Sequence, residues 1–375
     1  MKRFAAILAA CCLTMGAAQA ERVIEDEIST QYENIRLVEV VGGLEHPWAV
    51  AFLPDGSKLI TERPGRLQHL QDGELTEIHG VPEVVAINQG GMMDVSLHPD
   101  FEENGWVYLT YSKGDHNETA TTLVRGRVEG DQFVDMEEIF TQDRKSSPGR
   151  HYGSRLAWTG NGLLLMSVGD RGADPPRAQD LGDHAGALLR MHDDGTPPVD
   201  NPFVDTPGAH PEIYSYGHRN IQGIVVHPMT GEIWTNEHGP RGGDRLDLVK
   251  PGNNYGWPIV SYGRVYRTED QWGAGREAEG FEPPLYEFLP TIAPAGMALV
   301  TSRTFPNWQG NLLVPGLAPE HIRRVVVENY TVVHEEELLR GKIGRIRDVR
   351  EGPDGHLYVL NDEEDGSLFR IEPAS

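Results

Sequence analysis

Cysteine is nearly missing from this sequence of 375 residues, which contains only Cys11 and Cys12. Both lie in a stretch typical of a secretory signal, with a basic start, an apolar run and the letters AQA at 18–20. We expect cleavage after Ala20, which would remove both thiols. The mature chain, residues 21–375, would then have neither a disulfide nor a thiolate nucleophile, so packing alone must stabilise its core.

Long apolar runs are also missing beyond this leader. No later segment approaches the roughly 18 apolar residues of a membrane helix, so we expect no membrane insertion and a periplasmic or secreted protein. The stretch Leu8–Cys11 offers a second interpretation, a lipoprotein signal. Its apolar region would be very short, which favours the cleaved secretory signal.

Positive charge is scarce. Lys and Arg total 33 against 57 Asp and Glu, and the formal net charge is −24. This balance argues against nucleic acid or an anionic membrane as a partner. The sequence also has no HExxH motif, no paired-cysteine motif and no EF-hand loop, which removes support for a zinc enzyme or an EF-hand protein.

Glycine and proline, by contrast, are abundant at 43 and 26 residues. One pattern recurs, in which an apolar alternating run is followed by a turn ending in glycine and a second such run. Asp-Gly and Asn-Gly pairs in these turns are typical of β-hairpins. The six copies lie at 48–63, 93–112, 154–172, 222–239, 297–317 and 346–366.

The six hairpins predict an all-β fold, a six-bladed β-propeller with four-stranded antiparallel blades in a single domain spanning 21–375. The turn glycines recur about every 60 residues, which leaves room for four strands and loops per blade. A β-sandwich with coincidental turns is the alternative that the sixfold recurrence disfavours. We expect residues 35–41 to pair with the last blade, because closure protects a sheet edge.

The flanks of these hairpins have an unusual composition. The start of the first strand and the end of the second lie at the same end of a hairpin, so the flanks converge on one mouth of the central channel. They are rich in Arg, His, Gln and Asn, with glycines that let backbone approach a ligand. The candidate residues are Gln89, His151, Arg219, Asn220, Arg345 and Arg347.

Three of these candidates, Arg219, Arg345 and Arg347, would form a cationic cluster in an acidic protein. A surface ion pair is an equal alternative for any one arginine, but three at one mouth favour an anionic ligand bearing carboxylates or quinone oxygens. His151 precedes a strand at the same mouth, where a neutral imidazole can accept a proton. From spacing alone, a solvated or structural histidine remains the more frequent alternative.

The loop 237–244, EHGPRGGD, presents backbone carbonyls held by glycine and proline. Ligation by oxygen atoms alone suits Ca²⁺. The loop is therefore the candidate site for a calcium ion.

Several segments, in this order, resemble the soluble PQQ-dependent aldose sugar dehydrogenases of the glucose/sorbosone dehydrogenase family. The resemblance covers nearly the whole mature chain and implies a six-bladed propeller. It further implies PQQ and Ca²⁺ as cofactors and an aldose substrate oxidised at its anomeric carbon to a lactone. The segments are NQGGMMDVSLHPDF, GSRLAW, LLMSVGDRG, GHRNIQGIVVHP, NEHGPRGGD, NNYGWP and RIRDVREGPDGHLYVLND.

The resemblance also implies roles for individual residues. His151 would be the general base, and Arg219 would support charge developing on the reduced quinone. The carbonyls of Gly239 and Pro240 would bind the Ca²⁺, and Tyr255 belongs to a second, structural metal site. The residues implied to contact the cofactor are Gln89, Arg219, Asn220, Tyr266, Arg345 and Arg347.

Two positions depart from the family pattern. Ala318 stands where relatives often carry a lysine that contacts PQQ. Arg245 stands directly after GGD, where an acidic residue in relatives holds the structural calcium, so that second site is expected to be altered or lost. In the loop 264–290, Trp272, Tyr286 and Phe288 are candidates for a sugar-stacking wall, although ordinary loop packing is the favoured interpretation.

Two other functions remain open at this point. A calcium-dependent lactonase is the alternative enzyme, although its metal would need clustered carboxylate and Asn side chains. A binding propeller that lost its cofactor is the alternative without catalysis, to which Ala318 gives weight. The preferred sugar, the electron acceptor and the choice between monomer and dimer are not predicted.

Overall fold

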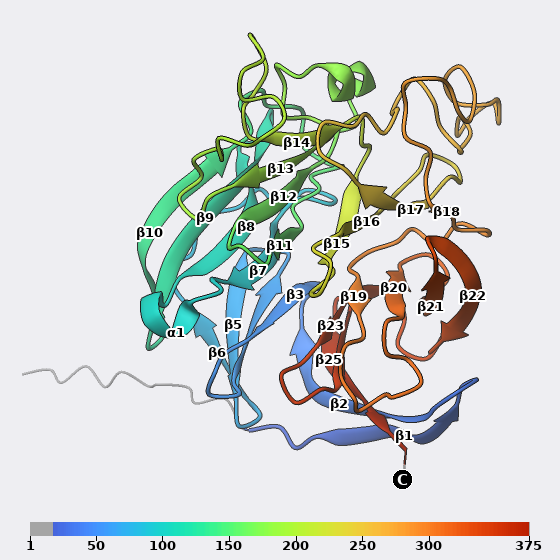
Figure 1. Ribbon diagram of the computed structural model, residues 1–375. Coiled ribbons are helices and arrows are strands. Elements are labelled where there is room, and N and C mark those ends of the chain that lie inside the picture. Colours follow the sequence, from blue (N-terminus) through green and yellow to red (C-terminus); the bar gives the residue numbers. More distant parts are fainter. Residues whose placement is uncertain (1–17, 375) are drawn as a thin grey trace, which may run out of the picture.

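The computed structural model describes residues 18–374 and places them almost entirely in β-strands and loops. The six sheets stand around a common axis, with the chain passing from one sheet to the next in order (Figure 1). The helical elements of the described chain are α1 (Phe101–Asn104) and the 3₁₀ turn η1 (Pro175–Gln179). Most of the predicted leader, residues 1–17, lies outside the described residues.

Each sheet, or blade, takes consecutive strands, apart from the last. The first three blades are β3 (Pro47–Phe52), β4 (Lys58–Glu62), β5 (Arg66–Gln71), β6 (Glu74–Ile78); β7 (Met92–Leu97), β8 (Val107–Gly114), β9 (Thr119–Glu129), β10 (Gln132–Thr141); and β11 (Leu156–Trp158), β12 (Leu164–Val168), β13 (Ala187–Met191), β14 (Ile213–Tyr216). The other three are β15 (Ile221–Val226), β16 (Ile233–Glu237), β17 (Arg245–Val249), β18 (Tyr286–Glu287); β19 (Ala298–Leu299), β20 (Leu312–Gly316), β21 (His321–Glu328), β22 (Thr331–Leu338); and β23 (Ile346–Glu351), β24 (Leu357–Asn361), β25 (Gly366–Pro373) with β1 (Arg22–Ser29) and β2 (Asn34–Leu44).

The predicted six-bladed propeller is confirmed. Every predicted hairpin corresponds to the first two strands of a blade, and all pairings within the blades are antiparallel. The first strands of neighbouring blades contact one another in sequence from β3 to β23, and β23 in turn contacts β3. The hairpins therefore surround the central channel, as the repeat pattern requires.

The ring closes through the N-terminal segment, as predicted for residues 35–41. Strand β2 pairs with β25, with Ile35 opposite Pro373 and Leu37 opposite Ile371. The last sheet differs from the predicted four strands, because β1 adds a fifth strand at the outer edge. Most of β1 is exposed, so it covers the edge of β2 while burying little surface of its own.

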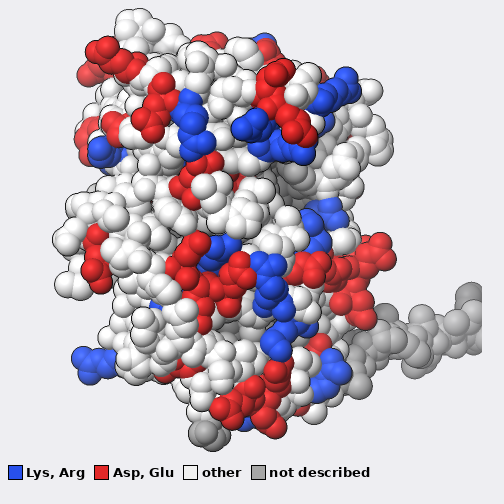
Figure 2. Space-filling model, turned by 90° about the vertical axis from the view of Figure 1, so that its right-hand side faces the viewer, with Lys and Arg blue, Asp and Glu red and all other residues white. Residues whose placement is uncertain are grey.

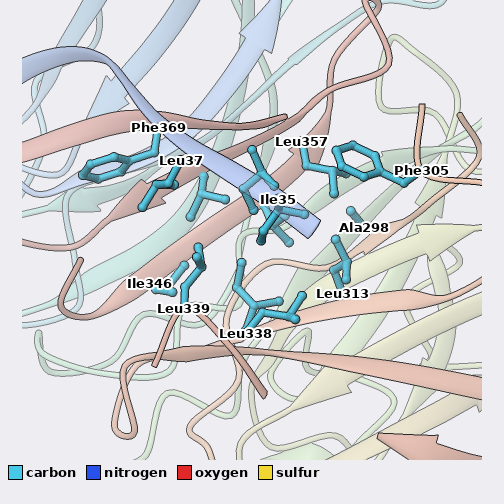
Figure 3. Packing of buried hydrophobic residues seen from close by; sticks show 14 of the residues in the cluster. Ile35, Leu37, Ala298, Phe305, Leu313, Leu338, Leu339, Ile346, Leu357 and Phe369 are labelled. Atoms are coloured by element: carbon cyan, nitrogen blue, oxygen red, sulfur yellow. The ribbon is translucent and has the colours of Figure 1, made fainter. Parts of the chain in front are cut away.

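Apolar cores lie between adjacent blades. In β12, Leu164 and Met166 pack toward the second blade, whereas Leu165 packs toward the fourth. Alternate residues thus fill two different cores, which explains why the strand is apolar throughout. Figure 3 shows the core between the fifth and sixth blades, where Ile35 and Leu37 join residues of both.

Among residues 18–374, no helix is long and apolar enough to cross a membrane. On the face displayed in Figure 2, Lys and Arg side chains lie interspersed with acidic ones.

Candidate functional site

A cavity of about 1060 Å³ opens where the flanks of the inner hairpins meet. A smaller cavity of about 140 Å³ adjoins it and shares Gln89, Arg345 and Arg347. The larger cavity is lined by His46, Arg63, Asn88, Gln89, Gly149, Arg150, His151, Arg219, Tyr266, Arg345, Arg347 and Asp362–Asp365.

Most of the predicted site residues meet here. Gln89, His151, Arg219, Arg345 and Arg347 line the larger cavity although they come from the flanks of four blades, and Tyr266 joins them from the loop before β18. Asn220 lines the smaller cavity. The predicted metal ligands Gly239, Pro240 and Tyr255 line neither cavity.

His151 is held in an unusual backbone conformation. Its φ of 55° lies in the left-handed region, and its amide donates a hydrogen bond of 2.7 Å to Gln89 Oε1. A Cβ on Gly169 would lie 2.1 Å from the His151 carbonyl oxygen, so glycine is required there. The backbone around His151 is therefore fixed by its neighbours before any ligand arrives.

The imidazole of His151 is oriented by a buried carboxylate. Its Nδ1 lies 2.6 Å from Asp170 Oδ1, which also accepts the Gly172 amide at 2.8 Å. The other Asp170 oxygen accepts the indole N–H of Trp257 at 2.6 Å. With the Nδ1 proton donated to Asp170, the lone pair of Nε2 is available for a ligand in the cavity.

The surroundings keep this imidazole neutral. Burial and the nearby charge of Arg219 lower the pKa of His151, and the hydrogen bond to Asp170 opposes them only in part. Burial alone would raise the pKa of Asp170, but His151 and Arg219 outweigh it and lower that pKa. A neutral imidazole beside an ionised carboxylate is the state in which a histidine accepts a proton.

Five arginines line the cavity together with the acidic segment 362–365. Within the described part of the chain, the Nε atoms of Arg63, Arg219 and Arg347 are buried without a hydrogen-bond partner. Buried guanidinium groups with unused donors favour binding of a planar anionic ligand. Arg219 also lies over the Trp257 ring, with its Cζ 5.2 Å from the ring centroid.

One carboxylate already pairs with this cationic group. Asp362, at the end of β24, forms an ion pair with Arg347 and lies 2.8 Å from His46 Nδ1. Burial would raise the pKa of Asp362, but the charge and hydrogen bond of Arg347 lower it far more. Asp362 therefore stays ionised and neutralises part of the arginine charge.

The loop predicted to hold Ca²⁺ lies beside the site. The Gly239 amide donates to Asp244 Oδ1 at 2.9 Å, and the His238 carbonyl accepts Arg219 Nη1 at 3.2 Å. Over residues 18–374, neither the Gly239 nor the Pro240 carbonyl accepts a hydrogen bond from the protein. Both oxygens are thus available to a cation, and their role as ligands remains a prediction.

Tyr255 and Arg245 are buried together away from the cavity. The Tyr255 hydroxyl donates to the Leu248 carbonyl, and its own carbonyl accepts Arg245 Nη1 at 3.0 Å. The Arg245 guanidinium lies between Glu237, at 2.6 Å, and Asp247, at 3.0 Å. A fixed positive charge therefore stands among these oxygen atoms.

Sequence reasoning did not include several residues of the site. Asp170 and Asp362 each follow the second strand of a predicted hairpin, but neither was given a role, and Trp257, His46 and Arg63 were not among the candidates. His46 and Arg63 flank the first hairpin as the chosen residues flank the others, so that signal was available. Trp257 had no such signal, because it reaches Asp170 from a loop 87 residues away.

The candidate sugar-stacking wall is mostly ordinary packing, the interpretation the sequence favoured. Phe288 is fully buried in the core between the fourth and fifth blades, and Tyr286 packs against that core. Trp272 stacks on Trp257 with a centroid distance of 4.9 Å. Ala318, which departs from the family pattern, does not line either cavity.

Comparisons with known proteins agree with this architecture. Aldose sugar dehydrogenase YliI of Escherichia coli is 41% identical over 337 residues, spanning 88% of this chain and 91% of that protein. The apo-form crystal structure of the soluble aldose sugar dehydrogenase from Escherichia coli superposes with a TM-score of 0.87 at 39% identity, covering 90% of this chain and 99% of that one. The PQQ-bound form of aldose sugar dehydrogenase from Streptomyces coelicolor gives a TM-score of 0.73 at 25% identity, covering 95% and 99%. The Glucose / Sorbosone dehydrogenase family profile matches residues 44–370, and the chain belongs to this family.

Proposed function

We propose that this protein is a PQQ- and Ca²⁺-dependent aldose sugar dehydrogenase that oxidises the anomeric carbon of its substrate to a lactone. The His151–Asp170 pair, placed beside guanidinium groups with unused donors, is the observation that carries the proposal. The names of the relatives, an aldose sugar dehydrogenase and a PQQ-bound structure, support the same activity.

The cavity fits the chemistry of PQQ, a planar quinone with three carboxylates. Arg345 and Arg347 would hold carboxylates, and the buried Nε atoms of Arg219 and Arg347 supply unpaired donors. Gln89 and Asn220 line the same space and would contact the ring system, with Tyr266 at the rim. When bound, PQQ supplies an electrophilic carbonyl that accepts a hydride.

The residues of this chain would supply the proton chemistry. His151 Nε2 would accept the proton of the anomeric hydroxyl, and Asp170 would stabilise the resulting imidazolium without itself taking the proton. Arg219 would place its charge where negative charge develops during hydride transfer. Burial of all three limits competition from water.

The Gly239 and Pro240 carbonyls would hold the Ca²⁺, since both oxygens lack protein partners in the described chain. A bound Ca²⁺ would act as a Lewis acid toward an oxygen of the cofactor. We further propose that the leader is cleaved after Ala20, that residues 21–375 act as one domain, and that the protein works in the periplasm or outside the cell.

The test uses the purified apo-protein. PQQ with Ca²⁺ is added, and aldose oxidation is followed with an artificial electron acceptor. Turnover that requires PQQ and is lost with a Ca²⁺ chelator is expected. PQQ binding without turnover on any aldose would instead indicate a binding propeller, and hydrolysis of lactones without PQQ would indicate a lactonase.

A further inference from the structure

A second cluster of ionisable side chains lies on the outside of the second and third blades, apart from the cavity. Asp143 follows β10, His184 lies just before β13, and His210 and Glu212 lie just before β14. None of the four lines the larger or smaller cavity. The residues come from three separate segments of the chain, so the fold itself brings them together.

The two imidazoles meet a single carboxylate. His184 Nδ1 lies 2.8 Å from Asp143 Oδ1, and His210 Nε2 lies 2.9 Å from Asp143 Oδ2. One ligand atom from each of the three residues lies within 4.8 Å of the others. The two rings stack with their centroids 3.8 Å apart, so the imidazoles lie side by side at Asp143.

A fourth residue orients His184 as metal ligands are oriented. Its Nε2 lies 2.7 Å from Glu212 Oε1, an arrangement in which Nε2 donates its proton to the carboxylate. With Nε2 bound to Glu212, Nδ1 is the nitrogen left to face Asp143. Histidines that bind metals usually donate their second nitrogen to a carboxylate in this way.

In the described chain, no lysine or arginine pairs with Asp143. The neighbouring cation, Arg144, is turned toward Asp183, at 3.2 Å, and so leaves the Asp143 carboxylate to the imidazoles.

We propose that His184 Nδ1, His210 Nε2 and the Asp143 carboxylate form a zinc-binding site, with water completing the coordination. Two imidazoles and one carboxylate suit Zn²⁺, which binds them at about 2.0–2.2 Å. A tetrahedral ion requires ligand atoms about 3.3 Å apart. The present distances must therefore open by a few tenths of an ångström, and the exposed side chain of Asp143 has room to move.

The site joins three loops near the catalytic pair. His184 lies in the loop 169–186, which begins with Gly169 and Asp170. Gln142, next to Asp143, accepts Arg171 Nη1 at 3.4 Å, and the His210 amide donates to the Leu181 carbonyl. A bound zinc ion would hold the segment that carries Asp170 against the second blade, so its role is structural.

The other group of His and carboxylate residues with metal-ligand spacing in the described chain comprises His218, Glu237 and Asp247. The Arg245 guanidinium already lies between its two carboxylates. This leaves the Asp143 cluster as the group of this spacing, within the described residues, whose carboxylate has no arginine or lysine bound to it.

The test is a calorimetric titration of the chelator-treated, PQQ-free protein with zinc chloride, followed by thermal unfolding with and without zinc. The wild type should bind one equivalent of zinc, and His210→Ala should bind none at this site. Zinc should raise the Tm of the wild type and leave the Tm of His210→Ala unchanged. Glu212→Gln, which keeps the shape of the side chain, should weaken binding about 10- to 100-fold. His116→Ala, a change at an exposed histidine outside the cluster, and His151→Ala should retain the equivalent.

Unchanged zinc binding in a folded His210→Ala or Glu212→Gln variant would overturn the assignment, as would the absence of zinc binding in the wild type. Loss of the equivalent in His151→Ala alone would place the ion in the cavity instead. No arm of this experiment depends on PQQ or on a sugar, so its failure is distinct from failure of the proposed dehydrogenase activity.

Discussion

His151 Nδ1 and Asp170 Oδ1 lie 2.6 Å apart across the two ends of a single hairpin, β11–β12. The hairpin brings together residues that flank its first and second strands. Trp257 fixes the second Asp170 oxygen from outside the hairpin. The imidazole therefore has one orientation, with Nε2 left to the cavity.

Replacing the imidazole tests its role as general base. His151→Ala should lower kcat by about 10²- to 10⁴-fold, the usual contribution of such a base, while PQQ affinity stays close to that of the wild type. Steady-state kinetics and a PQQ titration followed by absorbance separate the two effects. A parallel loss of PQQ affinity would make His151 a cofactor contact instead.

Asp170→Asn tests how the imidazole is positioned. An asparagine amide can donate to Nδ1, which would move the imidazole proton to Nε2 and remove the base. We expect kcat to fall by at least about 10²-fold with PQQ binding retained. Asp170→Glu, which keeps the acceptor, should recover part of the activity; equal loss in both variants would point to packing rather than orientation.

The pH profile gives an independent check. Because the pKa of His151 is lowered, its base form persists below pH 6.5, and the acid limb of kcat/KM should lie below that value. The Asp170 carboxylate raises this pKa, so the acid limb of the residual activity in Asp170→Asn should shift to still lower pH. A shift of the acid limb of Asp170→Asn to higher pH would mean that a group other than His151 controls the acid limb.

Asp362 pairs with Arg347 and would compete with an anionic cofactor for its guanidinium. Asp362→Asn removes a buried negative charge from the cavity and frees the guanidinium, so PQQ should bind more tightly. Arg347→Ala should weaken binding. Kd values from fluorescence titration at two salt concentrations measure both effects. Weaker binding in Asp362→Asn would show that Asp362 mainly holds Arg347 in position.

The blades could be predicted from the sequence because each hairpin carries its own signal, an alternating apolar pattern and a turn glycine such as Gly162. The closing strand was predictable for another reason, since a propeller must protect the edge of its last blade and residues 35–41 are mostly apolar. The fifth strand, β1, was not, because its exposed residues carry little pattern. Local periodicity thus identifies strands that are buried on both faces.

The site was predictable only where its residues flank a hairpin. Gln89, His151 and Arg219 have that position, and the fold brings them to one cavity. Contacts from outside the hairpins left no such signal: Trp257 reaches Asp170 from a loop 87 residues away. The zinc-site residues also lie far apart in the sequence, so only the folded chain shows their proximity.

Arg245 is expected to act as a fixed internal cation. Its guanidinium is buried between Glu237 and Asp247, and it lowers the pKa of Glu237 although burial opposes this. Arg245→Gln would leave buried carboxylates without a counter-charge and should reduce the free energy of unfolding by about 3–5 kcal/mol at pH 8. Denaturant unfolding measures the loss, and Arg22→Gln, which removes an exposed ion pair, should leave the midpoint unchanged.

The loss of folding stability in Arg245→Gln should grow as pH rises. Burial already raises the pKa of Asp247 to about 7, and it would rise further without the guanidinium. The pKa of Glu237, which Arg245 now lowers, would rise above its unfolded value. Folding then favours the protonated carboxyls, and stability falls as pH rises through the interval between the two sets of values. The free energy of unfolding of the variant should therefore approach that of the wild type near pH 4. It should fall furthest below the wild-type value at pH 8. A deficit independent of pH would mean that lost packing, and not uncompensated charge, destabilises the variant.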